Sequence, residues 1–440
     1  MKVSVKESCI VRPAQDTPKH SIWISNLDLL QARLHVGLIH CYELDGSSNF
    51  FDTELLKETL SRTLVPFYPV AGRLRRDHNG RPEIYCNADG VLFVVAETDS
   101  VMGGFAGVTR NPEFRHCVPT VDYSTDISSY PLLLVQVTFF KCGGVCLSIG
   151  WHLLLSDGHA LINFTRSWAQ LARGLPTNIT PFFDRTLLRA RFPPSITFHH
   201  PEFDPPPTMN SPNQTQEFQS CPKLVILKLT LDQLKVLKAS VNGTKTTANY
   251  TTHEVLVAHI WRCVSRARCL ADDQATRLHV TLNGRFKLVP PLPQNYFGSA
   301  IFPVRPIALA GDLRREPLED TAERIHRATK KMNDGYLRSA IDYLEKHPDI
   351  ECLVPRKGNE IYRCPNLSIV SWSRLPFHDF DFGWGKAVYA GPASIYSEGK
   401  GYISASPASD GSLLLAICLE INHVPLFKKL LYEVMPVSAM

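Results

Sequence analysis

The segment from residue 131 to residue 172 constrains the fold more than any other part of the chain. Apolar residues alternate with small or polar ones over residues 145–152, a period of two that predicts a β-strand. After a short polar turn, apolar residues recur at helical spacing, which predicts a helix over 157–172. A strand that passes directly into an amphipathic helix is a building unit of an α/β fold.

The remaining pattern extends this unit into two domains of similar size. Strands are predicted at residues 3–5 and just beyond, 34–44, 369–372, 401–406 and 413–420, and helices at 51–64 and 252–269. Prolines such as Pro193-Pro194 and Pro205-Pro206-Pro207 indicate a crossover loop. We therefore predict an N-terminal domain over residues 1–180, a crossover over 181–222 and a C-terminal domain over 223–440, each with a mixed sheet flanked by helices.

The composition excludes several classes of protein. The 440 residues are 44% hydrophobic and 20% charged, and the net charge of +5 is too mild and too dispersed for a nucleic-acid binder. No apolar run approaches the roughly 20 residues that span a bilayer, and the N-terminus has no apolar signal core. The twelve cysteines show no metal-binding spacing and suit a reducing compartment. A monomeric cytoplasmic protein without metal, membrane or nucleic-acid partner is expected.

Two motifs resemble those of a known family. The first is Asp157-Gly158 with its preceding strand, and the second is Asp381-Phe382-Gly383-Trp384-Gly385. Together they resemble the His-x-x-x-Asp-Gly and Asp-Phe-Gly-Trp-Gly signatures of the plant BAHD acyl-CoA-dependent acyltransferases. Longer stretches are similar to the hydroxycinnamoyl-CoA:shikimate/quinate hydroxycinnamoyltransferase branch, namely residues 11–15, 46–52, 65–74, 336–343 and 364–367. The resemblance covers essentially the whole chain and implies a solvent tunnel between the two domains.

The departure from the family lies at the catalytic position. The resemblance implies a general base four residues before Asp157, and that residue here is Leu153. His152 stands one residue too early, and neighbouring strand residues point to opposite faces. General acid–base catalysis contributes about 10²–10⁴-fold, or roughly 3–5 kcal/mol of transition-state stabilisation. Acyl transfer of the usual kind should therefore be crippled unless another group takes the proton.

The resemblance also implies roles for individual residues. Asp157, His152 and His40 are the candidates for the catalytic machinery, with Asp157 in a structural role because it should pair with Arg285. Lys357 replaces an arginine that binds the acceptor carboxylate, Val370 replaces a threonine, and His40 replaces a tyrosine. His35 is retained, and Leu153 and Trp384 should border the acceptor. Asp381, Gly383 and Gly385 should support the domain arrangement.

Three functions remain open from the sequence. The chain could transfer a hydroxycinnamoyl-type group from acyl-CoA, as co-substrate and with no bound cofactor, to an unusual phenolic, hydroxy-acid or amine acceptor. The proton would then be taken by His40, by His152 or by the acceptor's own amine. Alternatively, the fold could serve elimination, isomerisation or cyclisation, or act as a non-catalytic ligand-binding protein. The changes concentrate at the base and acceptor positions while the core motifs are intact, so a repurposed pocket in plant specialised (phenylpropanoid) metabolism is favoured over decay.

Overall fold

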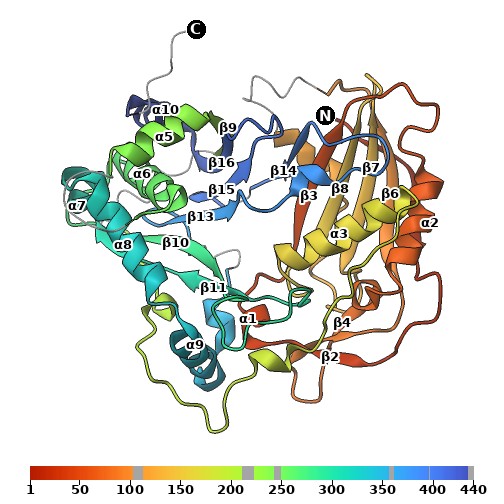
Figure 1. Cartoon of the computed structure of the whole chain (residues 1–440), viewed down its shortest axis with the longest axis horizontal. Helices are drawn as coiled ribbons and strands as arrows, with labels where there is room; N and C mark the ends of the chain where they lie inside the picture. Colours follow the sequence, from red (N-terminus) through yellow and green to blue (C-terminus); the bar gives the residue numbers. More distant parts are fainter. Residues whose placement is uncertain (103–111, 211–221, 242–248, 356–360, 396, 435–440) are drawn as a thin grey trace.

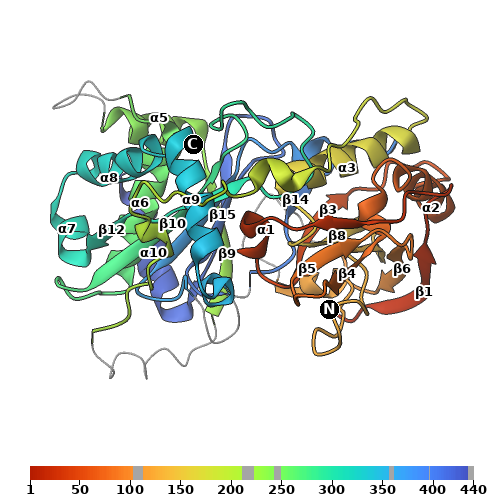
Figure 2. The same ribbon diagram turned by 90° about the horizontal axis from the view of Figure 1, so that it is seen from below.

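The computed structural model describes residues 1–102, 112–210, 222–241, 249–355, 361–395 and 397–434. The helices and strands form two units that lie side by side, each built on a mixed sheet (Figure 1). Seen from below, α1 (Asn26–Leu29) and α9 (Asp334–Lys346) lie near the middle of the molecule (Figure 2). Asn26 on α1 donates a hydrogen bond to Glu345 on α9 at 2.8 Å, so these two helices join the units. The predicted two-unit α/β fold is confirmed.

The first unit is built on a six-stranded sheet. The strands lie in the order β1 (Ser4–Val11), β6 (Val91–Thr98), β7 (Leu133–Phe140), β8 (Val145–His152), β3 (His35–Tyr42) and β14 (Tyr389–Pro392). Apolar residues of α2 (Thr53–Thr63) and α3 (Gly158–Ala172) share one core cluster with alternate residues of these strands. A small sheet of β2 (Ser21–Trp23), β5 (Pro82–Tyr85) and β4 (Arg73–Arg76) completes the unit.

The second unit is built on a seven-stranded sheet. Its strands are β11 (Ile301–Val304), β10 (Ala275–Asn283), β13 (Leu367–Trp372), β15 (Lys400–Ala405), β16 (Leu413–Glu420) and β9 (Pro222–Leu229), with β12 (Ile307–Leu309) paired to β10. Its helices are α5 (Leu231–Ala239), α6 (Thr252–Ala267), α7 (Ala310–Arg315), α8 (Leu318–Lys330), α9 and α10 (Val424–Glu433). Within the described ranges, no helix is long and apolar enough to cross a bilayer.

One strand departs from the expected division of the chain. β14 belongs to the C-terminal half of the sequence, yet it pairs antiparallel with β3 in the first sheet, with Ala390 opposite His40. Residues of the preceding segment, including Trp384, lie in the same core cluster as the first unit. The first unit is therefore not made from residues 1–180 alone, because the chain returns to it after β13.

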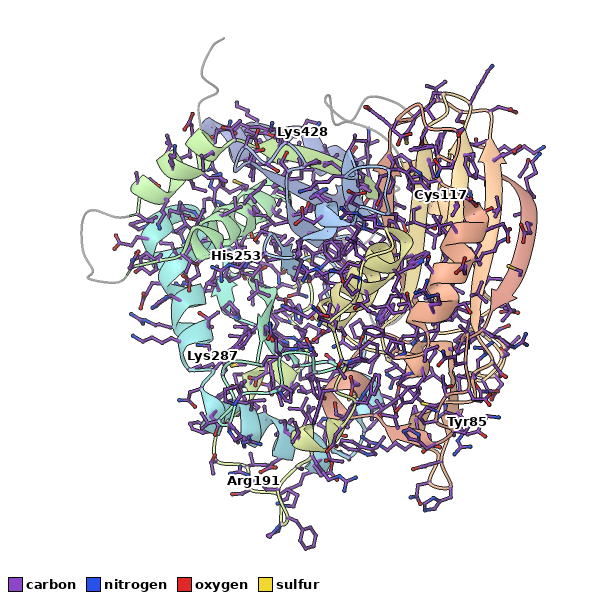
Figure 3. The ribbon with its side chains drawn as sticks, turned by 45° about the vertical axis from the view of Figure 1, so that its right-hand side comes forward. Tyr85, Cys117, Arg191, His253, Lys287 and Lys428 are labelled. Carbon is purple, nitrogen blue, oxygen red and sulfur yellow. The ribbon has the colours of Figure 1, made fainter. Side chains whose placement is uncertain are left out.

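The expected crossover is a loop over its described part, 181–210. The helices within this part are two short 3-10 helices, η4 (Arg185–Leu188) and η5 (Pro201–Phe203). Elsewhere, the described chain has five more 3-10 helices: η1 (Tyr68–Ala71), η3 (Pro112–Cys117), η6 (Ile350–Leu353), η7 (Phe377–Asp379) and η8 (Ile421–His423). Arg191 lies where the loop projects from the molecule (Figure 3). Its backbone N–H and its guanidinium both donate to Asp342 on α9, at 2.8 and 2.7 Å. Residues 211–221 of the expected crossover lie outside the described chain.

Candidate active site

The turn between β8 and α3 is anchored by the carboxylate of Asp157. Both oxygens accept hydrogen bonds from the Arg285 guanidinium, at 2.6 and 2.9 Å, and one also accepts the Ala300 N–H at 3.1 Å. The same carboxylate caps α3 by accepting the His159 N–H at 3.1 Å. Burial alone would raise the pKa of Asp157, but Arg285 outweighs it and holds the pKa below its usual value. The predicted buried ion pair is therefore present.

A second buried ion pair holds the same turn. Arg185 pairs with Asp28 at 3.2 Å, and its guanidinium donates to the carbonyls of Leu154 and Leu155. Asp28 also accepts the backbone N–H of Ser299 at 2.7 Å, which ties it to the second unit. Sequence reasoning missed this pair. The signal was present in the capping-box pattern Ser25-x-x-Asp28, whose aspartate lies in an otherwise apolar stretch.

His152 is sequestered within the protein. Its imidazole is completely buried, lies 4.9 Å from the His35 ring and stacks at 5.9 Å on Tyr130. Nδ1 accepts the backbone N–H of Leu154 at 3.2 Å, so the ring proton sits on Nε2. Burial holds the pKa of His152 well below its usual value. An imidazole whose only free nitrogen already carries its proton cannot accept another from a substrate.

His35 lies beside His152, to which it is paired in the β3–β8 register. Its Nε2 donates to the Pro131 carbonyl at 2.9 Å, and its Nδ1 accepts the Tyr123 hydroxyl at 2.7 Å. Burial lowers the pKa of His35 to about 4. Both nitrogens are therefore used by the protein, and the expected contact between His35 and substrate stays a prediction.

His40 lies on the opposite face of the same sheet. Its fully buried ring lies 5.3 Å from that of Phe380, and within the described chain neither nitrogen has a hydrogen-bond partner. Burial, with a further contribution from His378, lowers the pKa of His40 to about 3. His378 stands in η7; its Nε2 donates to the Ala405 carbonyl at 2.8 Å, and its Nδ1 is buried without a described partner. Sequence reasoning missed His378, although it precedes the Asp381 motif by only three residues.

Leu153 lies just beyond the end of β8 and is half-buried. Its backbone N–H donates to the Leu34 carbonyl at 3.1 Å, which places it next to the start of β3. His40 is five residues further along β3 than His35, so at ~3.4 Å per residue it lies ~17 Å from that end of the sheet. The imidazoles of His40 and His152 therefore do not occupy the place of the Leu153 side chain: His40 lies further along the sheet, and His152 is on the face that carries His35.

Three other predicted site residues lie in different surroundings. Val370 on β13 packs against the core cluster of the first unit, so it faces the junction of the two units. Trp384 is buried and stacks on Phe51 at 4.8 Å, as a core residue does. Lys357 lies outside the described residues. Whether Leu153, His40, Lys357 and Val370 line one tunnel therefore stays a prediction.

The Asp381 motif forms a tight turn. The Asp381 carboxylate accepts the N–H groups of Gly383 and Gly385, at 2.8 and 3.0 Å. The two glycines have φ values of +113° and +87°, which side-chain-bearing residues rarely adopt. Arg173, at the end of α3, approaches Asp381 to 3.9 Å. The turn therefore connects the β13–β14 segment to α3.

The described residues contain no group of three or more histidine, cysteine or acidic side chains that could hold a metal ion.

Comparison with known proteins identifies the family. The model of the Transferase family matches residues 1–434. The chain belongs to this family, the BAHD acyltransferases. It is 48% identical to shikimate O-hydroxycinnamoyltransferase of Nicotiana tabacum over 98% of this chain and 100% of that protein.

Two further matches are informative. Hydroxycinnamoyl-CoA:5-hydroxyanthranilate N-hydroxycinnamoyltransferase HHT4 of Avena sativa is 43% identical over 99% of this chain and 100% of that protein. The solved structure of F. graminearum TRI101 complexed with coenzyme A and deoxynivalenol has a TM-score of 0.73 at 17% identity. It covers 92% of this chain and 96% of the TRI101 chain, and it shows the same fold.

Replacing Asp157 by alanine should destabilise the protein strongly. Arg285 would be left as a buried charge without its partner, which costs about 3–5 kcal/mol. Thermal or denaturant unfolding, followed by circular dichroism, measures the loss. Asp232→Ala is the matched control, since that side chain is 81% exposed and its only described ion pair is with Lys235 on the surface. Equal stability of the two variants would contradict the structural role of Asp157.

The neutral, buried His40 should make the protein sensitive to mild acid. The unfolded chain binds a proton at His40 below pH ~6.5, whereas the folded chain does so only near pH 3. The contribution of His40 to stability is therefore complete above pH ~6.5 and falls by about 1.4 kcal/mol per pH unit below it. His40→Gln should reduce the slope of unfolding free energy against pH between 6.5 and 4 by that amount. His199→Gln, at an exposed position, should leave the slope unchanged.

Proposed function

We propose that this acyltransferase moves a hydroxycinnamoyl-type acyl group from CoA to an amine acceptor, with no protein base at position 153. The observation that carries the proposal is the state of His152, the one histidine of the motif. Its Nδ1 accepts a backbone N–H, and its ring packs against His35 and Tyr130. His40 is no substitute, because its pKa of about 3 makes it a weak base at neutral pH.

The choice of an amine follows from the chemistry of the attack. A hydroxyl must lose its proton as it attacks the thioester, and a positioned base contributes about 10²–10⁴-fold to that step. A neutral amine attacks through its lone pair and gives up its proton afterwards to solvent. The new C–N bond forms, the C–S bond breaks, and the CoA thiolate leaves and takes up a proton. The site then needs only to position the two substrates.

The relatives support an amine acceptor as well as CoA. The 43% identical protein of Avena sativa is named for N-acylation of 5-hydroxyanthranilate. The Nicotiana tabacum relative is named for O-acylation of shikimate, so the family includes both types of acceptor. TRI101, of the same fold, was crystallised with coenzyme A. The vacant base position favours the first of the two acceptor types for this chain.

Matched amine and hydroxyl acceptors test the proposal. With p-coumaroyl-CoA as donor, the purified protein should acylate aniline rather than phenol, and anthranilate rather than salicylate, by about 100-fold or more. Free CoA and the mass of the product are the measurements. Since aromatic amines are neutral at pH 6–9, the rate should show no imidazole-like rise in that range. His152→Ala should keep the activity of the parent. Faster transfer to the hydroxyl partner of each pair would refute the proposal.

Introducing a histidine at position 153 should restore transfer to hydroxyl acceptors. Leu153→His should raise hydroxyl transfer and introduce a rise in rate near pH 6–7, since the new imidazole must be neutral to act. Shikimate and quinate should be poor acceptors of the parent protein. The combination of Leu153→His with Lys357→Arg and Val370→Thr should favour shikimate further, because the bidentate fork and the hydroxyl return together. Initial rates with p-coumaroyl-CoA decide the point, and an unchanged acceptor preference in a folded triple variant would count against it.

A second candidate function has one observation in its favour. His378 contributes to the lowered pKa of His40, and three of the four nitrogens of these two imidazoles are buried without a described partner. Such a pair could move a proton within a bound ligand, as elimination, isomerisation or cyclisation requires. Turnover of a phenolic or carboxylate ligand without CoA, abolished by His378→Gln, would favour this function over acyl transfer.

A further inference from the structure

Three polar side chains form a row across the middle of the second sheet. In the strand register, His279 on β10 is paired with Ser368 on β13, and Ser368 with Lys400 on β15. Adjacent strands lie about 4.8 Å apart, so the row spans roughly 10 Å with Ser368 at its centre. Three segments far apart in the sequence thus bring a hydroxyl, an imidazole and an ammonium group together.

The row lies on the face of the second sheet opposite the second unit's own core, where the Tyr362 ring lies 5.0 Å from the His279 ring. Leu278, Leu367 and Ile369 neighbour the row in sequence and belong to the core of the second unit, so the row lies on the opposite face of the sheet. That face also carries Val370 and Tyr402, which pack against the core of the first unit. The row therefore lies two residues along the strands from the predicted acceptor position at Val370.

Each member of the row has a hydrogen-bond donor to spare. Ser368 is completely buried, and its hydroxyl has no partner in the described chain. His279 accepts the Arg305 Nε–H at its Nδ1, at 2.8 Å, which leaves the proton on Nε2 as a donor. Burial, with nearby cations, holds the pKa of His279 well below its usual value, so the ring is neutral.

Lys400 supplies a positive charge that no acidic side chain of the described residues neutralises. Its side chain is partly buried, and its ammonium nitrogen lies over the rings of Tyr362 and Tyr402, at 5.5 and 5.4 Å. Such cation–π contacts hold the ammonium in place but leave its N–H groups able to donate. Burying an uncompensated charge is costly, which a protein tolerates where a ligand supplies the counter-charge.

We propose that the row of His279, Ser368 and Lys400 binds the carboxylate of the acceptor. This inference rests on the proposed function, since it names the chemical class of the acceptor as an amine that also carries a carboxylate. One ammonium and two neutral donors match a single negative charge. The phosphates of CoA share the anionic chemistry, and Arg305 beside His279 adds a second cation, so CoA is the competing ligand that titration of Lys400→Met distinguishes.

Calorimetric titration with free acceptors, without a donor, tests the site independently of turnover. Anthranilate should bind the parent protein about tenfold or more tightly than its methyl ester, because the charge-assisted hydrogen bonds are lost with the charge. Lys400→Met should abolish this difference in affinity without weakening binding of the ester. Ser368→Ala should reduce the difference. Lys400→Arg should keep most of it. Lys429→Met, at an exposed position on α10, is the control and should keep all of it.

Other outcomes would overturn the inference. Equal binding of acid and ester by the parent protein would do so. The inference would also fail if Lys357→Met lost the difference in affinity between acid and ester while Lys400→Met kept it. The carboxylate would then be bound by the residue at position 357. A Lys400→Met protein that loses CoA affinity instead would assign the row to a phosphate. The melting temperature of Lys400→Met should not fall, since removing the buried charge offsets the loss of its cation–π contacts; a lower value would indicate a structural role. If anthranilate is bound more tightly than its methyl ester but no amine is acylated, the proposed function is wrong. The row would then still be a carboxylate-binding site.

Discussion

The arrangement of the two units depends on the carboxylate of Asp157. It ends the turn after β8, caps α3, and receives the guanidinium of Arg285 and the N–H of Ala300 from the second unit. A buried carboxylate that serves so many donors fixes the turn and the domain junction together, and no neutral side chain offers the same charge and number of acceptor sites. The Arg185–Asp28 pair holds the carbonyls of the same turn. Residues 153–156 are therefore held by contacts outside their own side chains, so the scaffold does not depend on the side chain at position 153.

The period of a β-strand explains why the neighbouring histidine does not compensate. His152 and Leu153 are adjacent, but the strand sends His152 to the face that carries His35, where it is enclosed by aromatic rings. Moving that imidazole to the other face would require the strand to shift by one residue. A shift would reverse the direction of every β8 side chain, including Leu147 and Trp151 of the core. Repacking that core would cost stability, so His152 stays on the face that carries His35.

Local sequence patterns predicted most of the elements, because the apolar residues of α3, α6 and β8 that face a core recur with the period of the helix or strand. The Asp157–Arg285 pair was also predictable, from the resemblance and from the rule that a buried carboxylate needs a partner. The return of β14 to the first sheet was not, since four residues carry no signal of which edge they join. The row of His279, Ser368 and Lys400 is a matter of register between three distant segments, and nothing local to any of them indicates it.

The vacant base position and the unpaired ammonium become understandable when they are considered together. In the proposed function no base acts at position 153, so the site relies on the acceptor's own nucleophilicity and on its orientation. Orientation requires at least one strong, directional anchor away from the reacting atom, and a single carboxylate held by one cation and two neutral donors provides it. Such an anchor also discriminates, because an acceptor without the charge would leave Lys400 and Ser368 unpaired at the junction of the units. The same two features that weaken catalysis of ester formation therefore favour an acceptor with an amine at one end and a carboxylate at the other.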